Sequence, residues 1–307
     1  SGLWIIIANS WMQTPAGFRM VEGQAYLTDF FKAALNPSSL IRYIHTALAG
    51  WITGSMAAAA VAAWYLLKRR FRKEALPMFK IAVIIFAAAS ILQLFSGHSH
   101  SVQVAEMQPE KMAAFEALWE SEDGASFAVF GIPDARSQKT HLAVRIPKLL
   151  SLMIHFDPEA RVAGLNEFPV EDRPPVFLPF ASYHLMILFG SIFIIMAGQA
   201  VFLMLRKKLA DSRIFLRMMI VFLALPYLAN EFGWIAAEVG RQPWAVYRIL
   251  RTADAVSPTV PAGNILFTLI LFIIIYALLG AVGMSVILKL IRRGPVSFSE
   301  NGKGKIG

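Results

Sequence analysis

Long apolar runs, separated by short polar and basic segments, dominate the 307-residue chain. Five of these runs are long enough to cross a bilayer as a helix, which takes about 20 residues. A single spanning segment has to satisfy its own backbone hydrogen bonds, so each run predicts a helix. The expected helices cover residues 41–67, 75–95, 176–205, 214–237 and 265–291. The fold class that follows is all-α, a polytopic transmembrane helix bundle.

Composition agrees with a membrane protein. Of all residues 57% are hydrophobic, 16% are charged and none is cysteine. The lack of cysteine excludes disulfides, thiolate-held metals and covalent c-type haem. The formal charge of +9 lies mostly in short clusters beside apolar runs, which indicates membrane orientation and not nucleic-acid binding. The opening apolar run of about 11 residues is only half a span, and it follows neither an initiator Met nor a signal peptide. We therefore expect a fragment of a longer chain.

The basic clusters orient the expected helices. They lie on one side of the membrane when five helices alternate, at residues 68–73, 206–213 and 292–305. Short cytoplasmic loops collect Lys and Arg, so we expect this side to be the cytoplasm. Four regions follow: a partial helix with two spanning helices (1–95), a long extracytoplasmic loop (96–175), three spanning helices (176–291) and a cytoplasmic tail (292–307). Within the loop, residues 109–121 predict a short amphipathic helix.

A histidine and a methionine at similar depth form the first candidate site. His45, in IRYIHTALAGWITG, lies about one turn inside the outer end of its helix, and Met186, in ASYHLMILFG, about two turns inside another. Imidazole and thioether are an axial pair of low-spin haem, in which the thioether raises the potential. Gly50 and Gly54 leave room for a flat macrocycle or a neighbouring helix. The alternative is that both are packing residues, His45 hydrogen-bonded and Met186 filling the core.

An acid at the outer end of the fourth expected helix forms the second candidate site. Glu238 is followed by Arg241 and Gln242 in GWIAAEVGRQPW, and Glu231 lies nearly two turns deeper. Acids in an apolar span are costly without a function, which favours a carboxylate ligand or proton relay. Arg241 and Gln242 would then bind propionates or fix Glu238. The alternative is an interfacial ion pair of Glu238 with Arg241, flanked by belt aromatics such as Trp234.

Three segments, GWIAAEVGRQPW, IRYIHTALAGWITG and ANSWMQTPAGF (residues 8–18), resemble subunit I of the cytochrome bd quinol oxidases. The similarity extends over nearly the whole chain, and GRQPW is highly specific. The resemblance implies that His45 and Met186 ligate a low-spin haem b, that Glu238 ligates a high-spin haem b, and that electrons pass on to haem d. The further residues expected to contact these cofactors are Arg241, Gln242, Trp234 and His184.

The loop at 96–175 resembles the family's quinol-binding loop in its compact form. The family's Lys and Glu of this loop fall on Lys111 and Glu116, which the resemblance implicates in quinol binding and oxidation. They lie about 140° apart on a helix, so they form a poor ion pair and could address a ligand separately. Without the resemblance, a solvated helix face is the simpler interpretation. We expect His98 and His100 in a loop at the membrane boundary, because two His alone indicate a metal only weakly.

Two departures from the family pattern bear on function. The N-terminal helices are missing, and with them a family His of the oxygen-reducing centre, so this fragment alone should not reduce oxygen. His184 stands where relatives commonly have Arg, two residues before Met186. A histidine is usually neutral near pH 7, so propionate binding and the haem potential are expected to differ.

The expected function is that of a haem-binding subunit of a cytochrome bd-type terminal oxidase. It would oxidise ubiquinol or menaquinol at the outer face and pass electrons through b haems to haem d, where oxygen becomes water. The expected partners are a second membrane subunit and the lipid bilayer of a bacterial or archaeal cytoplasmic membrane. Two alternatives stay open: a bd-like quinol dehydrogenase module without oxygen reduction, and a haem-free transporter or scaffold whose buried acids carry protons.

Overall fold

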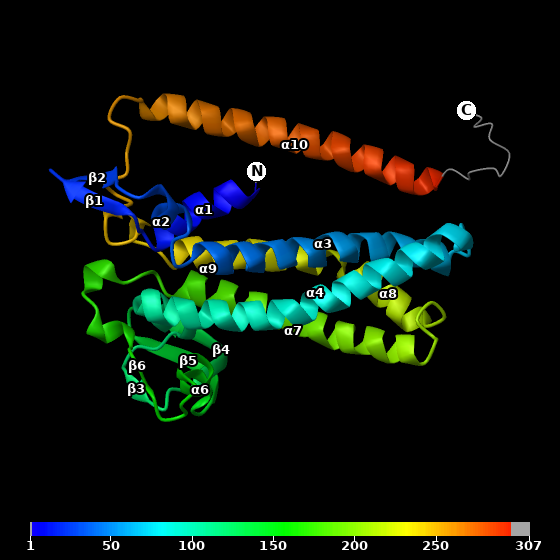
Figure 1. Cartoon of the computed structure of the whole chain (residues 1–307), viewed down its shortest axis with the longest axis horizontal. Helices are drawn as coiled ribbons and strands as arrows, with labels where there is room; N and C mark the ends of the chain where they lie inside the picture. The colour runs from blue at the N-terminus through cyan, green and yellow to red at the C-terminus, as the bar shows by residue number, and fades with distance from the viewer. Residues whose placement is uncertain (1, 296–307) are drawn as a thin grey trace.

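The computed structural model describes residues 2–295, and helices dominate it (Figure 1). Five helical segments are long and apolar enough to cross a membrane, as the apolar runs predict. Four of them are single helices, and the remaining one, the fourth along the chain, consists of α8 and α9. They are α3 (Ser39–Leu67), α4 (Arg72–Met107), α7 (Phe177–Leu205), α8 (Arg213–Val221) with α9 (Leu225–Val239), and α10 (Ala262–Arg293). The expected tail at 292–307 lies almost entirely outside the described residues.

Helices α3, α4, α7 and α8 share the main core. Small residues on α3, among them Ala59, Ala62 and Ala63, are fully buried at its contacts with the neighbouring helices. Small side chains let membrane helices approach closely, so that van der Waals packing can hold them together. Phe79 and Phe215 are fully buried in the same core, with ring centroids 6.3 Å apart in an edge-on arrangement.

The fourth expected span is interrupted. A 3-10 turn, η3 (Phe222–Ala224), separates α8 from α9. Pro226 stands in the first turn of α9, where its missing N–H and fixed φ are tolerated, but the ring cannot continue an α-helix from the preceding turn. The two parts therefore form one segment of 27 residues with a local break.

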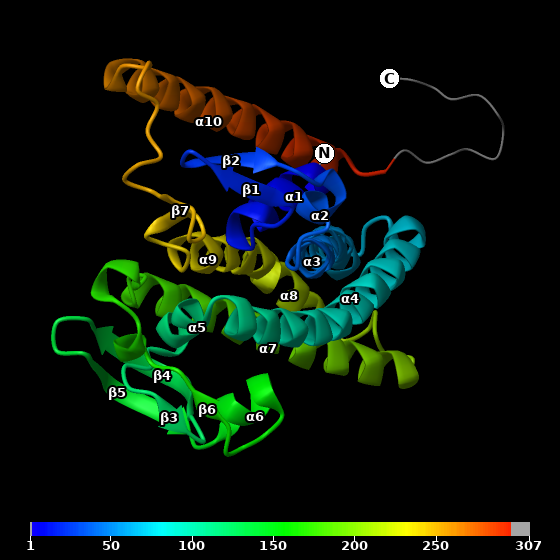
Figure 2. The same ribbon diagram turned by 60° about the vertical axis from the view of Figure 1, so that its left-hand side comes forward.

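Helix α10 stands away from the other helices, and Figures 1 and 2 show it beside the bundle. None of its residues is buried. Near its C-terminal end it contacts the bundle, where the Tyr65 hydroxyl donates to the carbonyl of Ile291 at 2.7 Å. Along most of its length, α10 offers an apolar surface to its surroundings.

One end of the bundle carries the long loop, and we refer to it as the loop end. It holds short helices and two-stranded antiparallel sheets that the expectation of an all-α fold did not include. The helices here are α1 (Gly2–Gln13), α2 (Phe30–Ala34), α5 (Pro109–Glu116), α6 (Leu149–His155), η1 (Leu165–Glu167) and η2 (Val170–Asp172). The paired strands are β1 (Phe18–Val21) with β2 (Gln24–Leu27), β3 (Glu122–Asp123) with β6 (Arg161–Val162), β4 (Phe127–Asp134) with β5 (Lys139–Ile146), and β7 (Trp244–Val246) with β8 (Leu250–Arg251).

Two local expectations for the loop differ from the structure. Helix α4 does not end near residue 95 but continues to Met107, so His98 and His100 lie on a helix and not in a loop. The expected amphipathic helix at 109–121 is shorter, ending at Glu116, and Glu110 to Glu116 are all buried. It is buried on every side because α4, α7 and η1 surround it.

Candidate functional site

A cluster of polar side chains lies where α1, α3, α5 and α9 meet at the loop end. We call it the loop-end cluster, and its members are Asn9, Gln13, Arg42, Lys111, Glu238 and Arg241. Asn9 and Gln13 are four residues apart on α1, so their side chains leave the same face of that helix. The fold thus gathers polar groups from segments that are far apart in the sequence.

Glu238 accepts hydrogen bonds at both carboxylate oxygens. Its Oε1 accepts from Asn9 Nδ2 at 2.9 Å and from Gln13 Nε2 at 3.4 Å. Its Oε2 accepts from Arg241 Nη2 at 2.7 Å, which is the ion pair that the sequence offered as an alternative. Burial lowers the pKa of Arg241, and the Glu238 charge opposes this. The carboxylate is therefore fixed in orientation by three donors, two from α1 and one from the segment that follows α9.

Arg42 adds a second buried guanidinium to the cluster. It lies in the first turn of α3, is only 6% exposed, and its Nη2 donates to Asn9 Oδ1. A buried charge needs hydrogen-bond partners, and the α1 amide supplies one. Asn9 thus connects the charge of Arg42 to that of Glu238.

Lys111 points from α5 to the end of α9 and not to solvent. Its Nζ donates to Gln13 Oε1 at 2.9 Å, to Gln108 Oε1 at 3.2 Å and to the carbonyl of Ala237 at 2.8 Å. All three ammonium protons therefore have an acceptor. Burial, and next the charge of Arg42, hold the pKa of Lys111 well below its usual range. The solvated helix face suggested for this residue was wrong.

Glu116 leaves α5 in a different direction and is completely buried. Its Oε2 accepts the backbone N–H of Ala128 on β4 at 3.0 Å and lies 4.0 Å from Nε2 of His184. Its Oε1 has no hydrogen-bond partner. Burial raises the pKa of Glu116 to about 8, against the effects of the Ala128 N–H and the charge of Arg145. Such a carboxyl can exchange a proton near neutral pH.

His184 lies between the loop and α7. Its Nε2 is 2.5 Å from the carbonyl oxygen of Ala128, and its Nδ1 is 2.9 Å from that of Phe180. Its ring also stacks on Phe180, with centroids 4.2 Å apart. A neutral imidazole can donate to only one of two carbonyls. When Nε2 carries the proton, His184 joins strand β4 to α7 beside Glu116.

The proposed iron ligands His45 and Met186 face different neighbouring helices. His45, on α3, faces α4, and Met186, on α7, faces α9. Both His45 ring nitrogens lie near Gln93 Nε2 on α4, at 3.0 and 3.2 Å, and the His100 ring lies edge-on at 5.5 Å. Met186, on α7, packs against Gly233 of α9. Among the described residues, no three His, Asp or Glu gather as a metal site.

The donor types of these two side chains suit haem, and one position beside them is too close for a side chain. A Cβ on Gly97 would lie 3.5 Å from Cε1 of His45, and a Cβ on Gly233 would lie 2.8 Å from Sδ of Met186. A methyl group at Gly233 would intrude on Met186, whereas one at Gly97 would make an ordinary contact with His45. Gln93 Oε1 is buried without a partner beside the imidazole, and imidazole with thioether is a haem donor set.

Two further residues expected at the cofactor sites do not join the loop-end cluster. Trp234 is 44% exposed on the surface of α9. Gln242 accepts from the Thr252 hydroxyl at 2.7 Å, so its side-chain oxygen points to the connection before α10. Both lie next to the cluster along the chain, and in the described part of the structure the hydrogen bonds to Glu238 come from Asn9, Gln13 and Arg241 instead.

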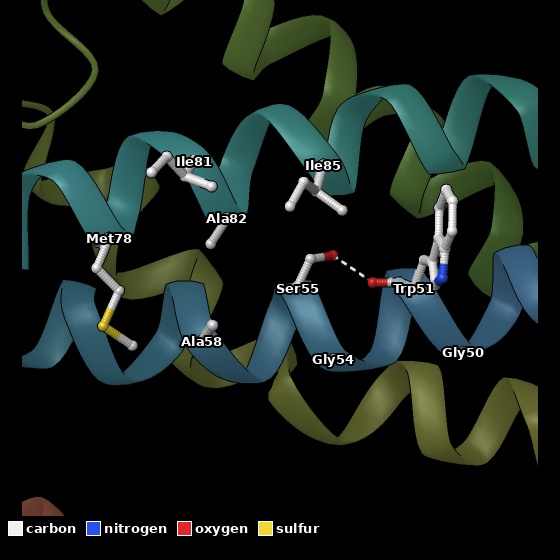
Figure 3. A pocket seen from close by; sticks show the side chains of 9 residues that line it. All are labelled: Gly50, Trp51, Gly54, Ser55, Ala58, Met78, Ile81, Ala82 and Ile85. Atoms are coloured by element: carbon white, nitrogen blue, oxygen red, sulfur yellow. Dashed lines mark hydrogen bonds between the residues drawn. The ribbon is translucent and has the colours of Figure 1, made fainter.

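Gly50 and Gly54 line an apolar groove between α3 and α4 (Figure 3). The groove has a volume of about 760 Å³ and is lined almost entirely by apolar side chains, including Met78 and Ile85. The Ser55 hydroxyl donates to the Trp51 carbonyl at 2.6 Å. A Cβ at either glycine would meet nothing within 4 Å, so no neighbouring helix among the described residues uses the space they leave.

The sequence did not single out several residues of the cluster. Arg42 carried a signal, because a charged residue at the start of an apolar span is costly without a partner. Asn9 and Gln13 carried another in their four-residue spacing. Outside the cluster, Gln108 beside Lys111 and Arg145 beside Glu116 had none, because their roles depend on how the loop folds back on α5.

Comparisons with known proteins agree on one family. The model of cytochrome bd terminal oxidase subunit I matches residues 1–295. Subunit 1 of the cytochrome bd ubiquinol oxidase of Bacillus subtilis (strain 168) is 36% identical, over 96% of this chain and 65% of that protein. Subunit 1 of the cytochrome bd-II ubiquinol oxidase of Escherichia coli (strain K12) is 30% identical, over 96% of this chain and 70% of that protein.

A solved structure shares the fold. The bd oxidase from Geobacillus thermodenitrificans matches with a TM-score of 0.87 and 28% sequence identity, over 96% of this chain and 67% of that chain. The chain spans 65% of the length of the Bacillus subtilis relative.

Proposed function

The chain belongs to the cytochrome bd terminal oxidase subunit I family, and from this premise we propose that it takes electrons from a quinol at the loop end. It passes them through b haems toward haem d and oxygen. The chain is multi-pass, because five of its helical segments are long and apolar enough to cross a membrane. The relatives' names include ubiquinol, but menaquinol presents the same hydroxyl groups to the protein.

One observation carries this proposal: Gln13 bridges the two expected sites. Its Nε2 donates to Glu238, the expected ligand of the high-spin haem, and its Oε1 accepts from Lys111, the expected quinol residue. Lys111 also reaches the carbonyl of Ala237, which directly precedes Glu238. Hydrogen bonds that connect a loop residue to a ligand residue keep the two sites in a fixed relation.

The haem-holding roles rest on the donor types and the space around them. Bound haem supplies one-electron oxidation and reduction. His45 and Met186 would hold the low-spin haem b, with Gly233 leaving room beside Met186. Glu238 would hold the high-spin haem b, while Arg241 and Arg42 supply positive charge for anionic groups.

Glu116 is the proposed proton acceptor. Oxidation of a quinol to a quinone releases its hydroxyl protons together with its electrons. Glu116 Oε1 is buried and has no partner, and its pKa of about 8 suits proton exchange near neutral pH. Because Glu116 lies at the loop end, the protons leave on the extracytoplasmic side in the orientation that the basic clusters indicate. Oxygen chemistry would draw its protons from the cytoplasm.

The proposed partner is a second membrane subunit. Helix α10 has no buried residue and is apolar along its length, so it offers a surface on which another membrane helix can pack. The haem d centre and the full oxygen-reducing activity belong to the whole protein. This chain spans about two thirds of the length of the Bacillus subtilis relative.

The substitution Glu116→Gln tests the proposal in the purified holoenzyme. The amide keeps the shape but cannot accept a proton, so quinol oxidation should slow by about a hundredfold, as for other removed acid–base groups. Turnover is measured both as oxygen uptake and with an artificial electron acceptor, which separates the oxidase from a quinol dehydrogenase without oxygen chemistry.

The matched control is Glu106→Gln, at an exposed acid near the end of α4. It should leave turnover unchanged. The reduced-minus-oxidised haem spectrum should be the same in both variants. Normal turnover in Glu116→Gln would contradict the proton-accepting role, and a chain that binds no haem in any form would contradict the whole assignment.

A further inference from the structure

Two cross-strand partner residues of the β4–β5 hairpin hold Glu116, one by its side chain and the other by its backbone. Ala128 and Arg145 are partners in this antiparallel pair. The Ala128 N–H donates to Glu116 Oε2 at 3.0 Å. From the opposite strand, Arg145 Nη2 donates to the backbone carbonyls of Glu116 at 3.3 Å and of Ala117 at 3.2 Å. The side chain and the backbone of Glu116 are thus fixed by the same two residues.

Arg145 contacts α5 at its C-terminal end, where a positive charge stabilises the helix. Helix α5 ends at Glu116, and Ala117 is its C-cap in the left-handed conformation. The last carbonyls of a helix lack partners within the helix and carry partial negative charge. A guanidinium that donates to two of them stabilises this end. Loss of Arg145 would therefore loosen the turn from which the Glu116 side chain leaves.

The positive charge of Arg145 can also stabilise the carboxylate form of Glu116. No ion pair is found for Arg145 within residues 2–295, and its Nη1 is buried without a partner. The other titratable groups facing Glu116 come from α7: His184, 4.0 Å from its Oε2, and Tyr183, whose ring stacks on Phe115. Strand β4 contributes only its backbone N–H. Lys111, on the same helix, points toward α9 instead.

We propose that Arg145 is a positioning residue for quinol oxidation, which holds the end of α5 and stabilises the negatively charged form of Glu116. The inference rests on the proposed function, in which Glu116 accepts a quinol proton. Burial in an apolar site disfavours the carboxylate, and a nearby cation favours it. Arg145 thereby keeps a completely buried acid deprotonated often enough to act as a base.

The sign of the pH effect follows directly. Glu116 can accept a proton only when it is deprotonated, so quinol oxidation falls as the pH drops below its pKa. Arg145 lowers this pKa. Without the guanidinium the pKa rises further, and the acid limb of the activity profile moves to higher pH. A cation close to a carboxyl lowers the carboxyl pKa by about one unit or more.

The experiment compares Arg145→Gln, Arg145→Lys and the wild type as purified holoenzymes. The pH profile of kcat/KM for quinol oxidation is recorded, with the haem spectrum and the thermal midpoint of each protein. We expect the acid limb of Arg145→Gln to move up by about one pH unit. Arg145→Lys keeps the charge and should stay close to the wild type. The control Arg136→Gln, in the exposed turn of the same hairpin, should not shift the profile.

The outcomes separate this inference from the proposed function. Equal profiles in Arg145→Gln and the wild type, or equal shifts in the Gln and Lys variants, overturn the role of Arg145. If Arg145→Gln loses its haem, Arg145→Leu replaces it as a second neutral variant. Loss of haem in both neutral variants would show that Arg145 only maintains the fold, which also overturns the proposal. Normal turnover of Glu116→Gln would instead overturn the proposed function.

Discussion

Lys111 and Glu116 illustrate what a single residue's environment adds to its sequence position. Their spacing correctly indicated that they point in different directions from α5. It could not indicate that both are buried, because burial depends on α9 and on strand β4, which are remote in the sequence. A buried ammonium and a buried carboxyl each need specific partners. Lys111 has three acceptors, whereas Glu116 has a donor at Oε2 and none at Oε1. Their roles toward quinol stay predictions.

Gly233 offers a prediction at the same scale. A Cβ there would lie 2.8 Å from Met186 Sδ, so in Gly233→Ala the sulfur must move by roughly 1 Å to reach an ordinary contact. The thioether is flexible and alanine favours the helix, so the free energy of unfolding should change by no more than about 1 kcal/mol. The low-spin haem should nevertheless lose occupancy or shift in potential, measured by redox titration of its absorption bands.

The matched control is Gly198→Ala, on the same helix as Met186. A Cβ at Gly198 would meet nothing within 4 Å, so its haem bands and potential should equal those of the wild type. If Gly233→Ala behaves like this control, Met186 is not an iron ligand.

At the scale of elements, the sequence predicted the spanning helices well and the loop poorly. Apolar runs of sufficient length can only be helices in a bilayer, which explains why five were found and confirmed. The strands at the loop end are short, and their pairing is set by contacts that no local pattern shows. Strand β5 did carry a signal, since Thr140, Leu142, Val144 and Ile146 alternate with other residues. Because its apolar side chains are exposed, the alternation indicates a strand of a hairpin but does not indicate which face packs against a core.

The β7–β8 hairpin supplies a prediction for an element. Tyr247 donates its hydroxyl to Glu110 Oε1 at 2.7 Å and its N–H to the carbonyl of Met12 at 2.9 Å, so it joins the hairpin to α5 and α1. Tyr247→Phe leaves the buried Glu110 without this donor, which should cost about 1–3 kcal/mol. Thermal unfolding should detect the loss.

Tyr26→Phe is the comparison, because within residues 2–295 the Tyr26 hydroxyl bonds only to exposed Gln24 in hairpin β1–β2. Its effect should stay within about 0.5 kcal/mol. Equal midpoints for the two variants would mean that the β7–β8 hairpin does not depend on Glu110.

For the whole molecule, composition and helix count established the class of protein, and the motifs established the family, which the comparisons confirm. The gathering of Asn9, Gln13 and Arg42 around Glu238 required the fold, because three separate segments contribute to it. The fold also leaves α10 with an unburied apolar surface, which its sequence alone could not distinguish from that of a packed helix.

The orientation of the molecule gives the last prediction. The loop end and the connection between α7 and α8 lie at opposite ends of the bundle (Figure 1), and basic residues are concentrated at the latter. Because the chain has no cysteine, single-cysteine variants report on one position each. Ser137→Cys, in the turn between β4 and β5, should react in intact cells with a maleimide that cannot cross the cytoplasmic membrane. Lys207→Cys should react only after the membrane is opened. The reverse pattern would place Glu116 on the cytoplasmic side, and quinol protons would then be released where oxygen reduction consumes them.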